Sequence, residues 1–241
     1  MKDLRNPSFA FDWFRKPSIE CQSMELYHVL NRGVEKRTLF LDSSDYARFV
    51  HDMYEFNDSR PTANSGHRFH PTMKGFVNPS LERELVVDIH GWCLMKNHYH
   101  LLLSERVPGG LSLFIRKLNI GYANYFNQRY SRTGTLFQGR TKKKLIDSDA
   151  YFLHILNYIH LNPLDYNRQA RDWRSRKIAN ASSAISHLKE YRWSSYLDYC
   201  GEKNFPSILT KDLFGDFCSE KSTTSYLKDI ELSNIQPYTL E

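Results

Sequence analysis

The stretch Leu85–Leu103, which reads LVVDIHGWCLMKNHYHLLL, decides the fold. It consists of two apolar runs separated by the polar pair Lys96-Asn97, a pattern that predicts two strands joined as a hairpin. His98 and His100 lie in the second run. Because side chains alternate between the two faces of a strand, both imidazoles are expected on one face. Polar groups in a buried strand are costly unless they are paired or ligated, so the two histidines provide half of a candidate metal site.

Apolar spacing along the rest of the chain predicts further strands and helices. The order is strand, helix, two strands, helix, basic strand, helix. This order is typical of an α+β fold in which helices pack on an antiparallel sheet, and the ferredoxin-like arrangement is the nearest common plan. Besides the hairpin, the predicted elements are strands at residues 24–32 and 135–146, helices at 43–56, 111–130 and 150–161, and one or two short helices after Gly201, the first containing residues 212–217.

Composition changes along the chain and sets the expected domain boundaries. Residues 1–23 mix proline, aromatic and charged residues without periodicity, and we expect an N-terminal extension there. Residues 24–199 hold the main predicted elements and are expected to form one domain. Within it, residues 57–81 contain several prolines and glycines and predict a long loop, a feature that is often functional. Residues 200–241 are expected to form a short acidic C-terminal extension.

The overall composition indicates a globular protein of the reducing cytoplasm. Hydrophobic residues make up 41% of the chain and charged residues 25%, which is ordinary for a folded domain. No apolar run approaches the ~20 residues needed to cross a bilayer, and the N-terminus lacks the apolar core of a signal peptide. Cys21, Cys93, Cys200 and Cys218 are scattered, which argues against a disulfide framework or a zinc knuckle.

Positive charge is concentrated in one segment of the chain. The net charge is +6, yet residues 106–146 contain nine Lys and Arg residues and no Asp or Glu. Residues 197–241 are net acidic. A field of one sign with aromatic residues among the charges is typical of a nucleic-acid-binding surface, since a merely solvated basic face usually includes acids. We therefore expect an anionic partner, and nucleic acid in particular.

The predicted helix at residues 150–161 supplies the other half of the candidate site. Tyr158 and Asn162 are four residues apart and so share one helical face. If that face meets the strand of His98 and His100, the site combines two imidazoles, an amide oxygen and a phenol. A divalent metal held by two histidines and an amide keeps open positions for substrate oxygens. The phenol, with an unperturbed pKa of about 10, needs a nearby positive charge or a base to act as a nucleophile.

Together these residues resemble a known family. Met95–Leu103 (MKNHYHLLL) is similar to the HUH motif of single-tyrosine HUH transposases, particularly that of their REP-associated tyrosine transposase branch. The resemblance covers residues 24–199 and is specific in combination rather than in any one segment. Its other segments, in order, are Tyr27-His28-Val29, Asn31-Arg32-Gly33, Phe40, Asp45-Tyr46, residues 134–140 (GTLFQGR), residues 158–163 (YIHLNP) and Trp193-Ser194-Ser195-Tyr196.

The resemblance implies a metal-dependent endonuclease and strand transferase that acts in DNA transposition. Such enzymes cut and rejoin single-stranded DNA near a hairpin: a tyrosine attacks a backbone phosphate, forms a 5′-phosphotyrosine link and frees a 3′-hydroxyl. At the matching positions, Tyr158 becomes the nucleophile. The metal ligands become His98, His100 and Asn162, and Mg²⁺ or Mn²⁺ is the expected ion. The resemblance also implies that the domain is a ferredoxin-like catalytic domain, and it leaves open whether the protein is a monomer or a homodimer.

The basic segment has an expected role in holding the DNA. Basic side chains contact phosphates and supply affinity without sequence information. The expected partner is a single-stranded DNA hairpin, and no membrane is involved. Unpaired bases could stack on Tyr125, Tyr130 and Phe137. The predicted DNA-binding residues are Arg129, Arg132, Arg140, Lys142, Lys143 and Lys144.

Two departures from the family pattern and several alternatives stand beside this interpretation. Tyr99 replaces the small aliphatic residue usual in the middle of the motif, and the loop at residues 57–81 is long for the family.

Tyr122, with Asn127 five residues on, is the alternative nucleophile, although it fits the apolar stripe of its helix. His28 is expected to be a packed strand histidine rather than a ligand. Two other functions fit the motifs: a hairpin-binding protein that no longer cuts, and a hydrolase of small phosphate substrates, which would not need nine uncompensated charges.

Overall fold

The computed structural model describes residues 24–60, 83–175, 177–215 and 219–230, and a four-stranded antiparallel sheet lies at its centre. The strands lie across the sheet in the order β2, β3, β1, β4. Their bounds are Leu26–Arg32 for β1, Val87–Met95 for β2, His98–Glu105 for β3 and Lys142–Leu145 for β4. One helix separates β1 from β2 and another separates β3 from β4, which is the ferredoxin-like succession. The predicted α+β fold is confirmed.

Three of the helices, α1 (Ser43–Glu55), α3 (Asp149–Leu161) and α4 (Ala181–Glu190), begin where a small polar side chain caps the first turn. The other helices of the described residues are α2 (Gly110–Arg129), α5 (Tyr196–Tyr199) and α6 (Glu220–Ile230). The carboxylate of Asp42 accepts hydrogen bonds from the first backbone N–H groups of α1, and the Ser148 hydroxyl accepts one at the start of α3. Such caps satisfy donors that have no partner within the helix. The predicted helices at 43–56, 111–130 and 150–161 are confirmed.

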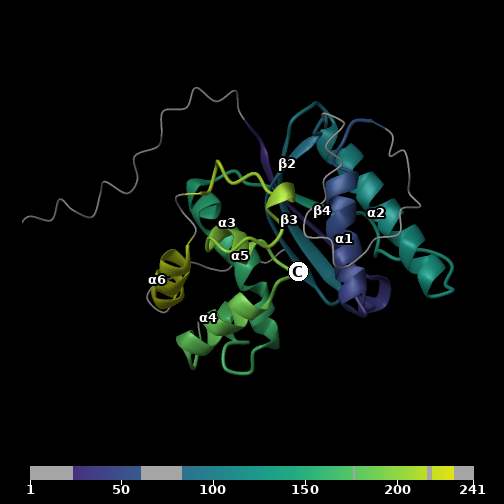
Figure 1. Cartoon of the computed structure of the whole chain (residues 1–241). Helices are drawn as coiled ribbons and strands as arrows, with labels where there is room; N and C mark the ends of the chain where they lie inside the picture. Colours follow the sequence, from purple (N-terminus) through teal and green to yellow (C-terminus); the bar gives the residue numbers. More distant parts are fainter. Residues whose placement is uncertain (1–23, 61–82, 176, 216–218, 231–241) are drawn as a thin grey trace, which may run out of the picture.

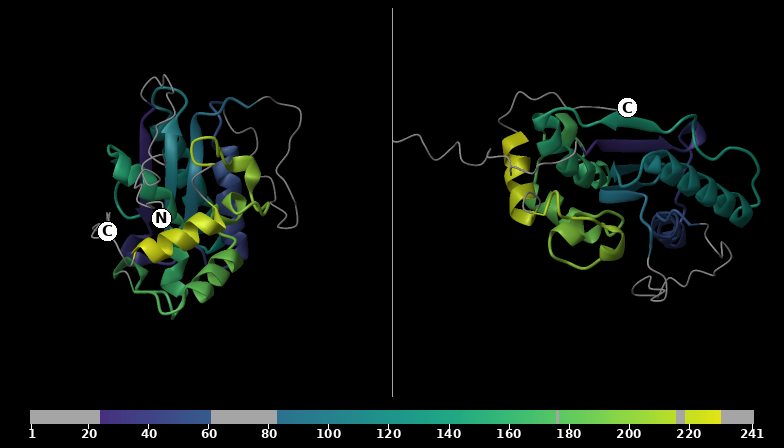
Figure 2. Two further views of the ribbon diagram at one scale, coloured as in Figure 1. Left: turned by 90° about the vertical axis from the view of Figure 1, so that its left-hand side faces the viewer. Right: turned by 90° about the horizontal axis from the view of Figure 1, so that it is seen from above.

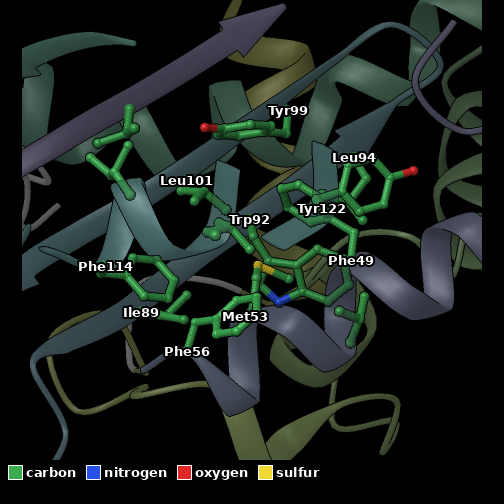
Figure 3. Close-up of a cluster of buried hydrophobic side chains, with 14 of the residues drawn as sticks. Phe49, Met53, Phe56, Ile89, Trp92, Leu94, Tyr99, Leu101, Phe114 and Tyr122 are labelled. Atoms are coloured by element: carbon green, nitrogen blue, oxygen red, sulfur yellow. The ribbon is translucent and has the colours of Figure 1, made fainter. Parts of the chain in front are cut away.

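Helices cover both faces of the sheet. Figure 1 and Figure 2 show α1 and α2 on one side of the strands and α3 to α6 on the other. Alternate strand residues feed the two layers: Tyr99 and Leu101 join the core under α1 and α2, whereas Leu102 joins the core under α3. Figure 3 shows the first core, where Phe49 of α1 and Phe114 of α2 pack with residues of β2 and β3. The sheet therefore separates two hydrophobic cores.

The second half of the chain departs most from the sequence prediction. No helix was predicted at α4, although Asn180 caps it and Ala184 and Leu188 bury one side of it. The helix predicted at residues 212–217 is wrong in its described part, because 212–215 form a hydrogen-bonded turn, with the Phe214 N–H donating to the Lys211 carbonyl. Residues 216–218, the predicted extension at 1–23 and most of the predicted loop at 57–81 lie outside the described residues.

The described part of the predicted C-terminal extension packs on the domain. Phe214 and Leu227 are buried in the α3 core, and the Thr210 N–H donates to the Ile89 carbonyl on β2 at 2.8 Å. These contacts make the segment part of the folded unit. Within the described ranges, no helix has the length and apolar character required to cross a membrane.

Candidate active site

β3 directs two buried imidazoles toward the α3 layer. His98 is 7% exposed and His100 is 1% exposed. The Nε2 atoms of both rings are buried and have no hydrogen-bond partner in the described part of the chain. Burial, with the positive charges of Arg32 and Arg174, lowers the pKa of His98 to about 3, and burial lowers that of His100 well below its usual value. Both rings are therefore neutral at pH 7, which is the form that binds a metal.

Asn97 fixes the tautomer of His98. The Asn97 amide donates from Nδ2 to the carbonyl of Lys36 at 3.2 Å, so its oxygen faces the imidazole. The His98 Nδ1–H then donates to this oxygen at 2.7 Å. A proton on Nδ1 leaves the lone pair on Nε2, as a metal ligand requires, and such an outer hydrogen bond also fixes the ring orientation.

His28 contacts the Nδ1 atom of His100, as Asn97 contacts that of His98. Its Nε2 lies 3.0 Å from His100 Nδ1, the two rings stack at 5.2 Å, and its Nδ1 lies 3.3 Å from the Tyr151 hydroxyl. If His100 Nδ1 donates to His28, the His100 Nε2 atom carries the lone pair. His28 is buried in its strand, as predicted, but its contact with His100 was not predicted. Because side chains alternate along each strand and β1 and β3 are neighbours, the sequence pattern already indicated that His28 and His100 share a face of the sheet.

Helix α3 brings Tyr158 and Asn162 to the same face. Tyr158 is 9% exposed, and its ring centre lies 6.0 Å from that of His100 and 5.9 Å from that of His28. Asn162 follows the last residue of α3, and its Nδ2 donates to the Tyr158 carbonyl at 2.8 Å. The Asn162 amide oxygen accepts a hydrogen bond from a residue outside the helix, Arg174.

Arg174, which the sequence reasoning missed, lies among these groups. Its Nη2 donates to the Asn162 amide oxygen at 2.6 Å, and its guanidinium carbon is 5.8 Å from the ring centre of Tyr158. Burial alone would lower the pKa of Arg174, but its ion pair with Asp165 and a hydrogen bond with Tyr158 raise it. Arg174 therefore stays charged and places a positive charge next to the Tyr158 ring.

The donor set fits a divalent metal. Among the described residues, two neutral imidazoles present buried Nε2 atoms that have no hydrogen-bond partner, and the Asn162 amide lies at the end of the facing helix α3. In the described part of the chain, no group of three or more His, Cys, Asp or Glu side chains could hold a metal. A metal here would therefore be held by His98, His100 and the Asn162 oxygen, with its other positions open.

The part of the sequence that contains most of these residues matches a known protein family. Residues 72–162 match the family model of IS200-like transposases. The matched stretch contains His98 and His100 and ends on Asn162, so the resemblance that the motifs indicated is confirmed there. Among solved structures, the chain is similar to a REP-associated tyrosine transposase bound to a REP hairpin, with 13% identity, a TM-score of 0.47, and 79% of this chain and 87% of that chain covered. No curated protein matches the chain.

Two of the basic residues predicted to bind DNA lie on the same face of the sheet as His98 and His100, with strand β1 between them. On β4, Lys144 is opposite His28 and Lys142 is opposite Leu30, so both belong to the α3 face. The Lys144 Nζ is 4.5 Å from the centre of the Tyr151 ring. Lys143 faces the other way, with its Nζ 3.3 Å from the Ser112 hydroxyl.

The remaining predicted DNA-binding residues differ in their surroundings. Arg129 forms ion pairs with Asp42 and Asp45, and Arg132 donates to the Thr135 carbonyl at 2.6 Å. Both therefore hold protein groups in place. Arg140 is exposed. The role of all six basic residues in binding DNA stays a prediction.

Tyr122, the alternative nucleophile, lies on the opposite side of the sheet. It is fully buried in the α1/α2 core and its hydroxyl donates to the Leu39 carbonyl at 2.6 Å. Burial raises its pKa well above the usual value. Tyr122 is thus separated by the sheet from the histidines, whereas the Tyr158 ring lies 6.0 Å from that of His100; the identity of the nucleophile stays a prediction.

Proposed function

We propose that the chain is a metal-dependent transposase that cuts and rejoins single-stranded DNA at hairpins through a 5′-phosphotyrosine intermediate. One observation carries the proposal: the buried Nε2 atoms of His98 and His100 have no hydrogen-bond partner among the described residues, and the ring of His100 lies 6.0 Å from that of Tyr158. A structural histidine pair would normally be satisfied by protein groups. The match of residues 72–162 to IS200-like transposases supports the same conclusion.

In this mechanism the Tyr158 oxygen attacks a backbone phosphorus. The new bond joins the tyrosine oxygen to phosphorus, and the bond from phosphorus to the 3′-oxygen of the preceding nucleotide breaks. The phenol loses its proton, and the departing 3′-oxygen gains one and becomes a hydroxyl. Attack by a 3′-hydroxyl on the phosphotyrosine reverses these changes and joins strands. A Mg²⁺ or Mn²⁺ ion held by His98, His100 and Asn162 would stabilise negative charge on the phosphate.

The surroundings of the site suit an extended polyanion. Lys142 and Lys144 lie on the sheet face that carries the histidines, and residues 106–146 contain no acidic residue. Phosphate contacts of this kind position a strand without reading its sequence. The motifs shared with the REP-associated branch make a hairpin the expected substrate.

The test uses labelled single-stranded hairpin DNA, drawn from repeats that flank the gene, with Mn²⁺ or Mg²⁺ and a denaturing gel. We expect a covalent protein–DNA band that requires metal and is absent in Tyr158→Phe. Tyr122→Phe is the matched control, because it removes a phenol on the other side of the sheet, and it should retain the band. A band that survives in Tyr158→Phe and disappears in Tyr122→Phe would contradict the assignment.

A second candidate function is hairpin binding without cleavage. One observation favours it: Arg174 already donates to the Asn162 oxygen that the metal would use. Tight hairpin binding with no covalent band, at any metal concentration, would select this alternative.

A further inference from the structure

We propose that Arg174 is a further catalytic residue, whose guanidinium holds the Tyr158 hydroxyl and binds the phosphate under attack. This inference rests on the proposed function. Arg174 lies beyond the segment that matches IS200-like transposases, which ends at residue 162, and it belongs to none of the motifs shared with the family. Its position in the folded chain carries the argument.

The surrounding groups hold the guanidinium in one place. Arg174 lies in the short helix Trp173–Ser175, and its guanidinium carbon is 4.4 Å from a ring centre of Trp173. Asp165 pairs with Nη1 of Arg174 and also accepts a hydrogen bond from the Trp173 indole at 2.9 Å. Nη2 is bound to the Asn162 oxygen. A planar guanidinium fixed at both ends and stacked on an indole is well ordered before any substrate arrives.

The same guanidinium faces the reacting groups. The guanidinium carbon of Arg174 is 5.8 Å from the ring centre of Tyr158, and its Nη2 is 2.6 Å from the Asn162 amide oxygen four residues further along the same helical face. Its side chain is 21% exposed, so solvent and a DNA strand can reach it. Nη1 and Nη2 carry two hydrogens each, and the bonds to Asp165 and Asn162 use one hydrogen on each atom. Arg174 therefore keeps N–H groups for an incoming oxygen.

These contacts match what the attack requires. As the Tyr158 oxygen loses its proton and bonds to phosphorus, negative charge develops first on the phenol oxygen and then on the non-bridging phosphate oxygens. A fixed cationic donor beside both positions stabilises that charge without reorganisation. Arginine suits the task because its forked N–H groups can bind two oxygens together.

The test compares Arg174→Ala with Arg171→Ala in the full chain, measuring the rate of covalent-adduct formation at saturating hairpin and hairpin affinity by fluorescence anisotropy. Arg171 is an exposed basic residue three positions earlier and serves as the matched control. We expect Arg174→Ala to slow adduct formation about a hundredfold, as for loss of one transition-state donor, with affinity changed only a few-fold. Added guanidinium ion should restore part of the rate, and Arg171→Ala should behave as wild type.

The possible outcomes separate the two proposals. An adduct formed by Arg174→Ala at the wild-type rate, or a loss that added guanidinium does not relieve, overturns the role of Arg174 and leaves the proposed function intact. No adduct with the wild-type chain overturns the proposed function itself. If Arg174→Ala fails to fold, Arg174→Lys retains the charge and the pairing with Asp165, and it should lose about tenfold in rate because the fork is lost.

Discussion

His28 illustrates how a residue outside the proposed ligand set can control it. We expect His28→Leu to weaken binding of Mn²⁺ by about 10- to 100-fold, the usual effect of removing an outer partner of a ligating histidine. The reason is that His100 loses the partner of its Nδ1 atom, the His28 Nε2 that lies 3.0 Å away. The measurement is a Mn²⁺ titration followed by electron paramagnetic resonance. His28→Gln, which keeps an acceptor, should retain more affinity, and equal affinity in His28→Leu and wild type would refute the role.

His90 makes folding sensitive to acid at a point distant from the proposed ligands. Its Nε2 is 2.8 Å from the Ser104 hydroxyl and its Nδ1 is 3.2 Å from the Thr210 carbonyl, and burial lowers its pKa. A histidine with a lowered pKa in the folded state gives stability that is full above pH 6.5, its unfolded value, and that falls as the pH falls. Urea unfolding should therefore show a smaller loss of stability between pH 7.5 and pH 5 in His90→Gln than in wild type. An equal loss in both proteins would show that His90 does not contribute.

At the scale of elements, Asp45 ties α1 to α2. Its carboxylate is fully buried and accepts hydrogen bonds from Tyr125 and Arg129 of α2 and from Tyr130, the residue that follows α2. Asp45→Ala should lower the free energy of unfolding by about 3–5 kcal/mol, because Arg129 and the two phenols lose their common acceptor. Urea denaturation measures this change. Asp42→Ala, which removes a helix cap and a more exposed ion pair, should cost only about 1 kcal/mol, and an equal cost for both variants would contradict the argument.

The elements between residues 24 and 161 could be predicted because their signals are local. Two apolar runs around a polar pair marked the hairpin, and three- and four-residue spacing of apolar residues marked α1, α2 and α3. The shared family segments also meet in space: Tyr46 stacks on Trp193 at 4.9 Å, and His160 Nε2 lies 2.8 Å from the Ser195 hydroxyl. Such contacts explain why these segments occur together.

The missed features depend on tertiary contacts. Arg174 lies in a polar, basic stretch without periodicity, and only the folding of that stretch against α3 brings it to Tyr158 and Asn162. The turn at residues 212–215 looked helical by composition, but it buries Phe214 in the α3 core as a turn. The residues of the proposed site could be predicted from the sequence because local spacing brings them together in pairs. His98 and His100 share one face of a strand, and Tyr158 and Asn162 are four residues apart on a helix.

At the scale of the molecule, one chain contains every residue of the proposed site. Helix α3 packs on β2 and β3 of its own sheet, which places Tyr158 beside His100 without a second copy. Mixing His98→Ala chains with Tyr158→Phe chains should therefore give no covalent adduct on the hairpin gel. Mixing either variant with wild type provides the control for DNA quality. An adduct formed by the two inactive variants together would mean that α3 is exchanged between chains.

All the residues proposed to bind metal or attack DNA lie on one side of the sheet, the side covered by α3. The core under α1 and α2 contains none of the residues proposed to bind metal or attack DNA, whereas the α3 face contains His98, His100, Tyr158 and Asn162. Laboratory evolution of this protein can therefore treat the two sides as separate libraries. Substitutions under α1 and α2 would be screened for heat tolerance, and substitutions around α3 would be screened for a new choice of DNA strand.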